Sequence, residues 1–226
     1  MPTVLITGAN RGIGLEFARQ YGADGWQVIA TCRNPIGVGE LATIEGNIQI
    51  HGLDVTDTRQ RERLANELEG TTIDVLINNA GIYGPKGYGP GDIDLRDWHQ
   101  TLEVNAMTPL LVSMAFVPHV VAAGGKIVTL SSKMGSMEDN TSGGNYIYRS
   151  SKAAANAVMK SLANDLSSKS IPVGVMHPGW VETDMGGPNA LISTETSVTG
   201  MRQVIEKLDM ASTGNFFNYD GAKVPW

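Results

Sequence analysis

Short apolar segments alternate along the chain with segments whose apolar residues have helical spacing. Thr3–Thr7 is the first apolar segment, and it stops at a glycine. In Gly12–Tyr21 the apolar residues recur at every fourth position, as they do along one side of a helix. The further segments that we expect to be strands are Gln27–Thr31, Asn47–Leu53, Ile73–Asn78, Lys126–Ser131, Ile171–Met176 and Asn215–Tyr219. The further expected helices are Arg59–Leu68, Asp97–Val121 as two stretches separated near Asn105–Pro109, Tyr148–Ser167 and Ser197–Leu208.

Strands that are apolar throughout and alternate with helices are typical of a parallel sheet covered on both faces. Right-handed crossovers then favour a doubly wound, Rossmann-like strand order. We therefore predict an α/β fold with about seven parallel strands and helices on both faces. No internal repeat, low-complexity tract or long linker divides residues 1–226, so we expect a single dinucleotide-binding and catalytic domain.

The composition narrows the class of protein. A net charge of −6 offers no general attraction to nucleic acid or to anionic membranes, and we expect neither as a partner. The single cysteine, Cys32, cannot form an internal disulfide, which fits a reducing compartment. A strand pattern starts within two residues of the N-terminus and no apolar run spans a bilayer, so we expect a cytoplasmic protein. The four histidines lack metal-ligand spacing, and we predict no metal site.

A glycine-rich turn follows the first strand. The residues Thr7-Gly8-Ala9-Asn10-Arg11-Gly12-Ile13-Gly14 stand between that strand and the first helix. Glycines allow a tight turn and a close approach of the backbone, while free N–H groups and the helix dipole face an anion. This junction therefore predicts a pyrophosphate site, and its TGxxxGxG spacing differs from the GxGxxG of other dehydrogenases.

Six further motifs occur in order along the chain. They are Asp54-Val55 after the third strand, Asn78-Asn79-Ala80-Gly81 after the fourth, Asn105 in the following helix, Ser131-Ser132 before Tyr148-Arg149-Ser150-Ser151-Lys152, and Pro178-Gly179-Trp180-Val181-Glu182-Thr183 after the sixth strand. With the glycine turn, this set resembles the short-chain dehydrogenase/reductase family over almost the whole chain. The stretches HPGWVETDMGG and FNYDGAKVPW resemble more narrowly the C-factor-like and sniffer-like carbonyl reductases. The resemblance assigns cofactor binding to Gly8, Asn10, Arg11, Gly12, Ile13, Gly14, Arg33, Asp54, Val55, Asn79, Ala80, Gly81, Tyr148, Lys152, Pro178, Gly179, Val181 and Thr183.

Reduction of a carbonyl needs a hydride and a proton donor with a suitable pKa. Tyrosine has an ordinary pKa of ~10, and a nearby cation lowers it. Tyr148 and Lys152 are four residues apart, so on a helix they share one face. We expect Lys152 to lower the pKa of Tyr148 and, by resemblance, to hold the nicotinamide ribose.

Two more residues complete the catalytic set that the resemblance implies. Ser132 is expected to bind the substrate oxygen beside Tyr148, although it precedes Tyr148 by sixteen residues and not by the family's usual thirteen or so. The Gly-, Ser- and Asn-rich loop at residues 133–145 absorbs the difference. Ser131 should point to the opposite side of the strand end. Asn105 is expected to hold a water or a backbone group behind Lys152.

The end of the second strand bears on the choice of cofactor. Members that use NAD have an acidic residue there, whereas this chain has Cys32 and Arg33. The Arg33 guanidinium can pair with a 2′-phosphate, and Arg11 could supply a second cation. We therefore predict that NADP(H) is preferred, and use of NAD(H) stays open.

The main interpretation is an oxidoreductase that reduces a ketone or aldehyde to an alcohol, with Tyr148 as proton donor. Two alternatives stay open: an NAD-dependent alcohol or diol dehydrogenase, and a cofactor-binding signalling or regulatory protein of C-factor type. The intact Ser132, Tyr148 and Lys152 count against a purely binding role. The expected partner is a small carbonyl or alcohol substrate. Small residues after Tyr148 allow close helix packing, either internally or in a homodimer or homotetramer. The Gly/Pro-rich run at residues 83–92 is expected to border the substrate entrance.

Overall fold

The protein folds around one parallel sheet of seven strands in the order β3-β2-β1-β4-β5-β6-β7. The structure is a computed structural model that describes residues 1–85, 91 and 93–226. The strands are β1 Thr3–Thr7, β2 Gln27–Cys32, β3 Asn47–Gly52, β4 Val75–Asn78, β5 Lys126–Leu130, β6 Val173–His177 and β7 Phe216–Asn218. The helices are α1 Gly12–Ala23, α2 Thr58–Glu67, α3 Leu95–Leu102, α4 Thr108–Ala123, α5 Tyr146–Asp165 and α6 Thr194–Lys207. This order confirms the predicted doubly wound fold.

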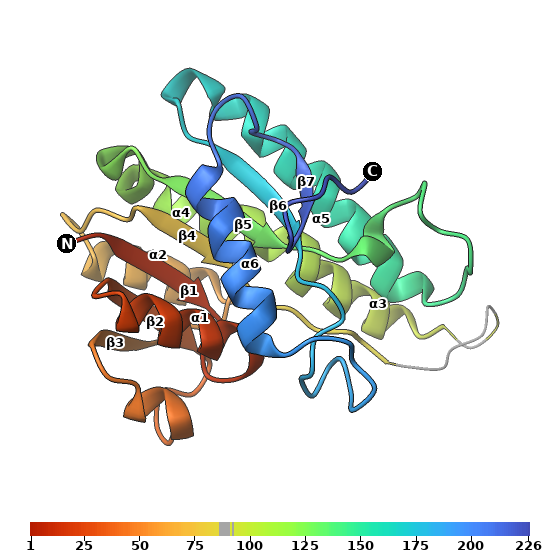
Figure 1. The fold of residues 1–226 in the computed structure, drawn as a ribbon, viewed down its shortest axis with the longest axis horizontal. Helices are drawn as coiled ribbons and strands as arrows, with labels where there is room; N and C mark the ends of the chain where they lie inside the picture. Colours follow the sequence, from red (N-terminus) through yellow and green to blue (C-terminus); the bar gives the residue numbers. More distant parts are fainter. Residues whose placement is uncertain (86–90, 92) are drawn as a thin grey trace.

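Helices cover both faces of the sheet and bury two hydrophobic cores (Figure 1). On one face α1 and α6 bury Phe17, Tyr21 and Met201 against the strands. On the other face α2, α4 and α5 contribute residues such as Phe116 and Met159. Because both faces of the central strands are covered, β1 and β4 are buried along their whole lengths.

The edge strand β3 departs from the prediction that the strands are apolar throughout. It pairs with β2 alone, and its first residues alternate between exposed polar and partly buried apolar side chains, as at Asn47, Ile48 and Gln49. An edge strand is covered less completely than a central one, so apolar residues at alternate positions are sufficient to bury its covered side.

The helical region that was expected as two separate stretches is continuous. A single π-helical turn, Glu103–Met107, joins α3 to α4 without a break. Pro109 follows this π turn, and the Thr108 hydroxyl donates to the Val104 carbonyl at 2.7 Å, so the helix continues past the proline. The π turn occurs at Asn105, and such turns are frequent at functional sites.

The described residues include one helix, Leu95–Ala123, whose length and apolar composition would allow it to cross a membrane. In this fold 44% of its apolar window is buried. Val112, Phe116 and Val120 are almost completely buried in the core between this helix and the sheet. The helix therefore has the packing of a core helix.

Local capping explains why two helices begin earlier than expected. The chain turns into α5 through Gly143, Gly144 and Asn145, which all have left-handed φ angles between 48° and 65°, so the helix starts at Tyr146 and not at Tyr148. Ser193 accepts a hydrogen bond from the Thr196 amide at 3.1 Å and starts α6 at Thr194.

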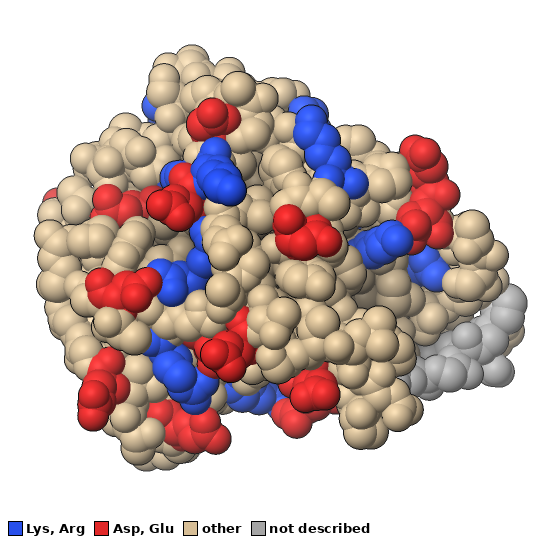
Figure 2. All heavy atoms as spheres, in the orientation of Figure 1, with Lys and Arg blue, Asp and Glu red and all other residues tan. Residues whose placement is uncertain are grey.

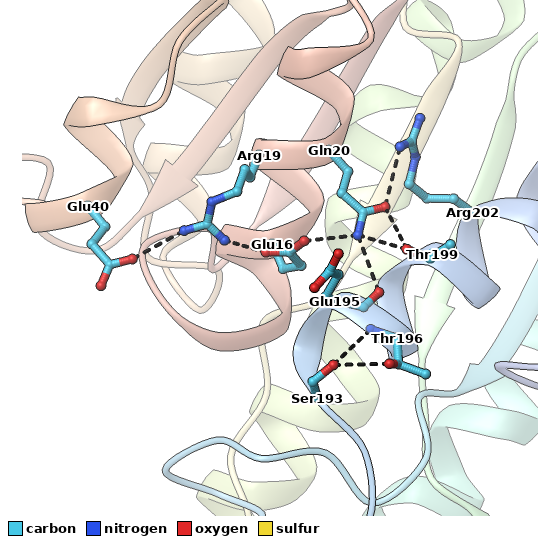
Figure 3. Close-up of polar contacts among 9 residues, drawn as sticks. All are labelled: Glu16, Arg19, Gln20, Glu40, Ser193, Glu195, Thr196, Thr199 and Arg202. Carbon is cyan, nitrogen blue, oxygen red and sulfur yellow. Dashed lines mark hydrogen bonds and ion pairs between the residues drawn. The ribbon is translucent and has the colours of Figure 1, made fainter.

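A polar network fixes α6 against α1 (Figure 3). The side-chain nitrogen of Gln20 donates to Glu16 at 2.9 Å and to Thr199 at 3.1 Å. Arg202 donates to the Gln20 side-chain oxygen at 3.4 Å, and Arg19 pairs with the buried Glu16. These contacts hold the helix that begins at the glycine-rich turn.

Charged side chains of both signs are interspersed on the face shown in Figure 2. No large area of this face carries positive side chains alone, which agrees with the net charge of −6. This face offers no basic surface of the kind that binds nucleic acid.

Candidate active site

The glycine-rich turn joins β1 to α1 at the carboxyl edge of the sheet. Gly8 and Gly12 have φ angles of +67° and +55°, which L side chains rarely adopt. Gly14 is required for a different reason, because a Cβ there would lie 2.3 Å from the Gly8 carbonyl oxygen and 2.5 Å from the Asn79 side chain. The absence of side chains lets the helix N-terminus and its free N–H groups reach a pyrophosphate, so the turn fits a dinucleotide.

Gly14→Ala is expected to lower both the free energy of unfolding and the affinity for NADPH. Overpacking typically destabilises a protein by about 1–3 kcal/mol, and here the colliding atoms belong to the turn itself. Chemical denaturation and NADPH titration would measure the two effects. Gly25→Ala, in a loop where a Cβ meets nothing within 4 Å, is the control for added bulk, although its φ of +76° adds strain. Wild-type NADPH affinity in Gly14→Ala would contradict the close packing.

The turn after β4 holds the glycine-rich turn in place. The Asn79 amide nitrogen donates to the carbonyl oxygens of Thr7 at 2.8 Å and Gly8 at 3.0 Å. The Thr7 hydroxyl accepts from the backbone N–H groups of Asn79 and Ala80, both at 3.0 Å. The sequence assigned Asn79 and Ala80 to cofactor binding, and in this structure they also brace the turn.

A cleft of about 420 Å³ runs along this edge of the sheet. The residues from the predicted set that line it are Arg11, Gly12, Ile13, Asn79, Ala80, Gly81, Tyr148, Lys152, Pro178 and Thr183. The lining residues that the sequence did not predict are Leu15, Arg19, Glu40, Leu130, Ser131, Glu182, Asp184, Met185 and Thr194. The cleft therefore connects the glycine-rich turn with the Tyr148–Lys152 pair.

Tyr148 lies in the first turn of α5 and is 8% exposed. Its ring stacks on Tyr83, with the ring centroids 4.3 Å apart. Burial raises the pKa of Tyr148 to about 12, while a hydrogen bond with the Ser132 hydroxyl lowers it and the neighbouring Tyr83 raises it. Tyr148 therefore carries its proton throughout the physiological pH range.

Lys152 is buried one turn further along α5. Its Nζ donates to the Leu130 carbonyl oxygen at 2.9 Å and lies 5.9 Å from the centroid of the Tyr148 ring. Burial lowers the pKa of Lys152 to about 8. Burial is the largest influence on the pKa of Tyr148 in this structure, and the Lys152 ammonium is directed toward the Leu130 carbonyl, so the expected lowering of the Tyr148 pKa by Lys152 stays a prediction.

The long loop after β5 brings Ser132 to Tyr148. A short 3₁₀ turn, η3 (Lys133–Gly135), begins at Ser132, whose hydroxyl accepts from the Met134 amide at 3.1 Å. Ser131 points elsewhere, because its hydroxyl bonds the Asn156 side chain at 2.5 Å and the Lys152 carbonyl at 3.4 Å. The two serine hydroxyls therefore have different partners, although Ser131 is the one that lines the cleft.

Asn105 holds a backbone group, as expected. Its carbonyl oxygen accepts from the Ile82 amide at 2.9 Å, and its amide nitrogen donates to the Ile82 carbonyl at 2.7 Å and to Ser151 at 3.0 Å. A Cβ on Gly81 would lie 3.2 Å from Asn105 and 3.6 Å from the Lys152 Nζ. Asn105 thus ties the segment after Asn79–Gly81 to α5 behind Lys152.

The residues expected around the adenosine lie at the same edge of the sheet. Arg33 directly follows β2, is exposed, and within the described part of the chain forms no hydrogen bond or ion pair. Arg11 pairs with Asp184 at 2.6 Å, which links the glycine-rich turn to the loop after β6. Asp54 accepts from the Thr56 amide at 3.0 Å, and the Val55 carbonyl accepts from Arg61 at 2.6 Å.

The last motif faces the glycine-rich turn across the cleft. A Cβ on Gly12 would lie 3.3 Å from the Thr183 methyl group. Gly179 has a φ of +87°, and a Cβ there would meet the Ile192 side chain at 2.5 Å. Val181 is buried and bridges to Ile192. Asn10 is exposed in the glycine turn.

Sequence analysis did not identify Tyr83 as a neighbour of Tyr148. The sequence signal that could have identified it is the position of Tyr83 two residues after Gly81. The segments after β4 and β5 meet at one edge of the sheet, and α5 with Tyr148 follows β5. Tyr83, Asn145 and Ile147 line a small pocket beside Tyr148, which supports an entrance near residue 83. Residues 86–90 and 92 of the expected entrance run lie outside the described residues.

Two other titratable groups lie near this edge. Burial, and secondarily the Lys133 cation, lowers the pKa of His177 to about 4, and its buried Nδ1 has no hydrogen-bond partner among the described residues. Cys32 is buried, and its thiol donates to the Asn34 carbonyl at 3.2 Å. Among the residues that the structure describes, no group of three His, Cys, Asp or Glu side chains could hold a metal ion.

Comparisons with known proteins identify the family of this chain. The short chain dehydrogenase family model matches residues 2–191. C-signal from Myxococcus xanthus is 44% identical over 155 residues, which cover 68% of this chain and 93% of that protein. The carbonyl reductase Sniffer of D. melanogaster has a TM-score of 0.94 at 36% identity and covers all of both chains. The NADPH-bound carbonyl reductase from chicken fatty liver has a TM-score of 0.92 at 34% identity, covering 100% of this chain and 99% of that one.

Proposed function

The chain belongs to the short-chain dehydrogenase family of oxidoreductases, and from that premise we propose that it reduces a ketone or aldehyde with NADPH. The observation that carries the proposal is one continuous cleft with a glycine-rich turn at one part and Tyr148 and Lys152 at another. Turnover of purified protein with NADPH and a panel of carbonyl compounds tests it. Absence of NADPH oxidation with every carbonyl would contradict it.

The residues along the cleft and those that directly follow β2 and β3 fit NADP(H). The turn at Gly8–Gly14 would hold the pyrophosphate, and Arg33 and Arg11 would face the 2′-phosphate. Asp54 and Val55 would border the adenine, while Asn79–Gly81, Lys152 and the Pro178–Thr183 segment would border the nicotinamide half. When bound, the cofactor supplies the hydride. The NADPH-bound chicken carbonyl reductase supports this choice.

The protein's own groups provide the proton. Tyr148 holds a proton at neutral pH and is the donor to the carbonyl oxygen. Ser132, which hydrogen-bonds Tyr148, binds the same oxygen and orients it. Lys152 supplies positive charge behind the tyrosine and favours the phenolate that remains once the proton has left.

Arg33→Ala is expected to weaken NADPH binding by about 1.5–3 kcal/mol, the range for a hydrogen bond to a charged group. This corresponds to a roughly 10- to 150-fold higher Kd, and NADH binding should change little because NADH lacks the 2′-phosphate. Cys32→Asp should penalise NADPH through like-charge repulsion, and the two changes together should reverse the preference. Fluorescence titration with each cofactor measures these affinities.

Arg59→Ala is a matched control, because Arg59 is an exposed arginine in the first turn of α2 and not at the end of β2, where the 2′-phosphate is expected. Equal losses for NADPH and NADH in Arg33→Ala would contradict the phosphate contact. In that case Arg11, once released from its ion pair with Asp184, would be the leading candidate for the contact with the 2′-phosphate.

A second candidate is a cofactor-binding signalling protein, which the similarity to C-signal favours. Such a protein would bind NADPH but would not need Tyr148 for its effect. The carbonyl panel distinguishes the two, because only the reductase oxidises NADPH in proportion to the carbonyl. Oxidation of an alcohol or diol with NAD would use the same residues in reverse and is measured separately, as the reduction of NAD with a panel of alcohols and diols. The cytoplasmic location and the homodimer or homotetramer stay predictions.

A further inference from the structure

The last residues of the described chain fold back beside the loop that carries Ser132 (Figure 1). After β7 the chain turns and returns antiparallel, with Asn218 N–H donating to the Ala222 carbonyl at 2.7 Å and Val224 N–H to the Phe216 carbonyl at 2.8 Å. Val224 is buried, and the Trp226 ring stacks on Phe216 with centroids 5.7 Å apart. This return places Trp226 against the segment after Ser132.

Three donors of that segment converge on one atom. The backbone oxygen of Trp226 accepts from the amides of Met137 and Glu138, both at 3.1 Å, and from the Ser136 hydroxyl at 3.3 Å. The Ser136 hydroxyl also accepts from the Asp139 amide at 3.1 Å. Ser136 is 2% exposed, so its hydroxyl bonds are the sheltered ones of this set, whereas Met137 and Glu138 are exposed residues. Trp226 therefore clamps the first half of a loop rich in glycine, serine and asparagine.

Short hydrogen-bonded steps connect this clamp to Ser132. The Ser136 amide donates to the Lys133 carbonyl at 3.0 Å, and the Gly135 amide donates to the Ser132 carbonyl at 2.8 Å. The Ser132 hydroxyl itself accepts from the Met134 amide at 3.1 Å. A displacement of Ser136 would therefore be transmitted through a single turn to the serine hydroxyl.

Helix α5 packs against the other side of the loop that follows Ser132. A Cβ on Gly135 would lie 2.7 Å from the Lys152 carbonyl carbon, and the Asn156 amide donates to the Gly135 carbonyl at 3.4 Å. Lys133 pairs with Asp139 at 3.1 Å across the loop. The turn thus lies between α5, which carries Tyr148 and Lys152, and the tail that ends at Trp226.

We propose that Trp226 is a positioning residue for carbonyl reduction, acting through Ser136 to fix the Ser132 hydroxyl beside Tyr148. This inference rests on the proposed reductase function. A misplacement of 1 Å can reduce a rate by ~100-fold, and the sixteen-residue separation of Ser132 from Tyr148 leaves a long loop to be held. The indole ring anchors the backbone oxygen by packing on Phe216.

Trp226→Ala removes the anchor, and kcat is expected to fall by roughly 10- to 100-fold while the KM for NADPH stays within about twofold. Trp226→Phe keeps a ring on Phe216 and should restore most of kcat. Thr141→Ala, an exposed position further along the same loop, is the control and should behave as wild type. Steady-state kinetics with a carbonyl substrate of the wild-type enzyme measures all three.

A double-mutant cycle with Ser132→Ala separates positioning from general stability. If Trp226 acts through Ser132, Trp226→Ala should change kcat by less than about twofold in the Ser132→Ala background. An equal fold-loss in both backgrounds would overturn the proposal, and so would unchanged kcat in Trp226→Ala alone. A rise of the KM for NADPH in Trp226→Ala as large as the fall in kcat would also overturn the proposal.

Amide hydrogen exchange tests the clamp without using activity. In Trp226→Ala, exchange at Met137 and Glu138 should accelerate at least ~10-fold while the core strand β5 keeps its protection. Unchanged exchange would overturn the clamp even in an active enzyme. Faster exchange in Trp226→Ala, together with no carbonyl reduction by the wild-type protein, would contradict the reductase function and still support the clamp.

Discussion

Tyr148→Phe is expected to reduce carbonyl turnover at least ~100-fold, because only the proton donor is lost while the ring remains. The ring stacks on Tyr83 and is buried, so the phenylalanine ring keeps these contacts. NADPH should therefore bind with nearly unchanged affinity. Initial rates with the best substrate of the carbonyl panel and fluorescence titration with NADPH measure the two quantities.

Tyr146→Phe provides the control, since Tyr146 begins the same helix and is 45% exposed. Its rate should match the wild type. Retention of more than about a tenth of the rate in Tyr148→Phe would remove Tyr148 as the proton donor. An equally large loss of NADPH binding would show that the hydroxyl supports the cleft.

Lys152→Met is expected to lower the rate at least ~100-fold and also to weaken NADPH binding. Methionine approximates the buried stem but carries no charge, and it leaves the Leu130 carbonyl without its 2.9 Å donor. Both assigned roles of Lys152, the charge behind Tyr148 and the contact with the ribose, are lost together. Lys160→Met, further along the exposed side of α5, is the control and should leave both quantities unchanged.

The pH dependence gives a second measure of the same group. Burial lowers the pKa of Lys152 to about 8, so this cation is present below pH 8 and is lost as the pH rises through that value. The kcat/KM of the wild-type enzyme should therefore fall above about pH 8, because that ratio reports groups of the free enzyme. Lys152→Met should lack this fall. A wild-type profile that stays flat to pH 10 would contradict the lowered pKa of Lys152.

Much of the fold could be predicted because its signals are local. The apolar run Thr3–Thr7 and the glycines that follow it encode a strand, a turn and a helix within a few residues. The helix boundaries were less predictable. Asn145 and Ser193 decide where α5 and α6 begin through left-handed backbone and capping bonds, which hydrophobic spacing does not reveal.

The features of the candidate site also differ in whether the sequence could predict them. The pairing of Tyr148 with Lys152 could be predicted because a helix places residues four apart on one face. The pKa shifts could not, because they depend on how completely the sheet, the loop after β5 and Tyr83 exclude water from these two groups.

The amino-acid sequence by itself determined the doubly wound sheet, the glycine-rich turn and the placement of Tyr148 and Lys152 on one helix face, since each is encoded by periodicity or by short spacings, whereas the roles of Asn105 and Ser132 were predicted from the family resemblance. Only the tertiary structure decided which distant segments meet there. It stacked Tyr83 on Tyr148, joined Arg11 to Asp184 and brought Trp226 to the loop of Ser132. These pairs are separated by tens of residues or more, and their contacts follow from the order of the strands and the paths of the loops, which no local pattern records.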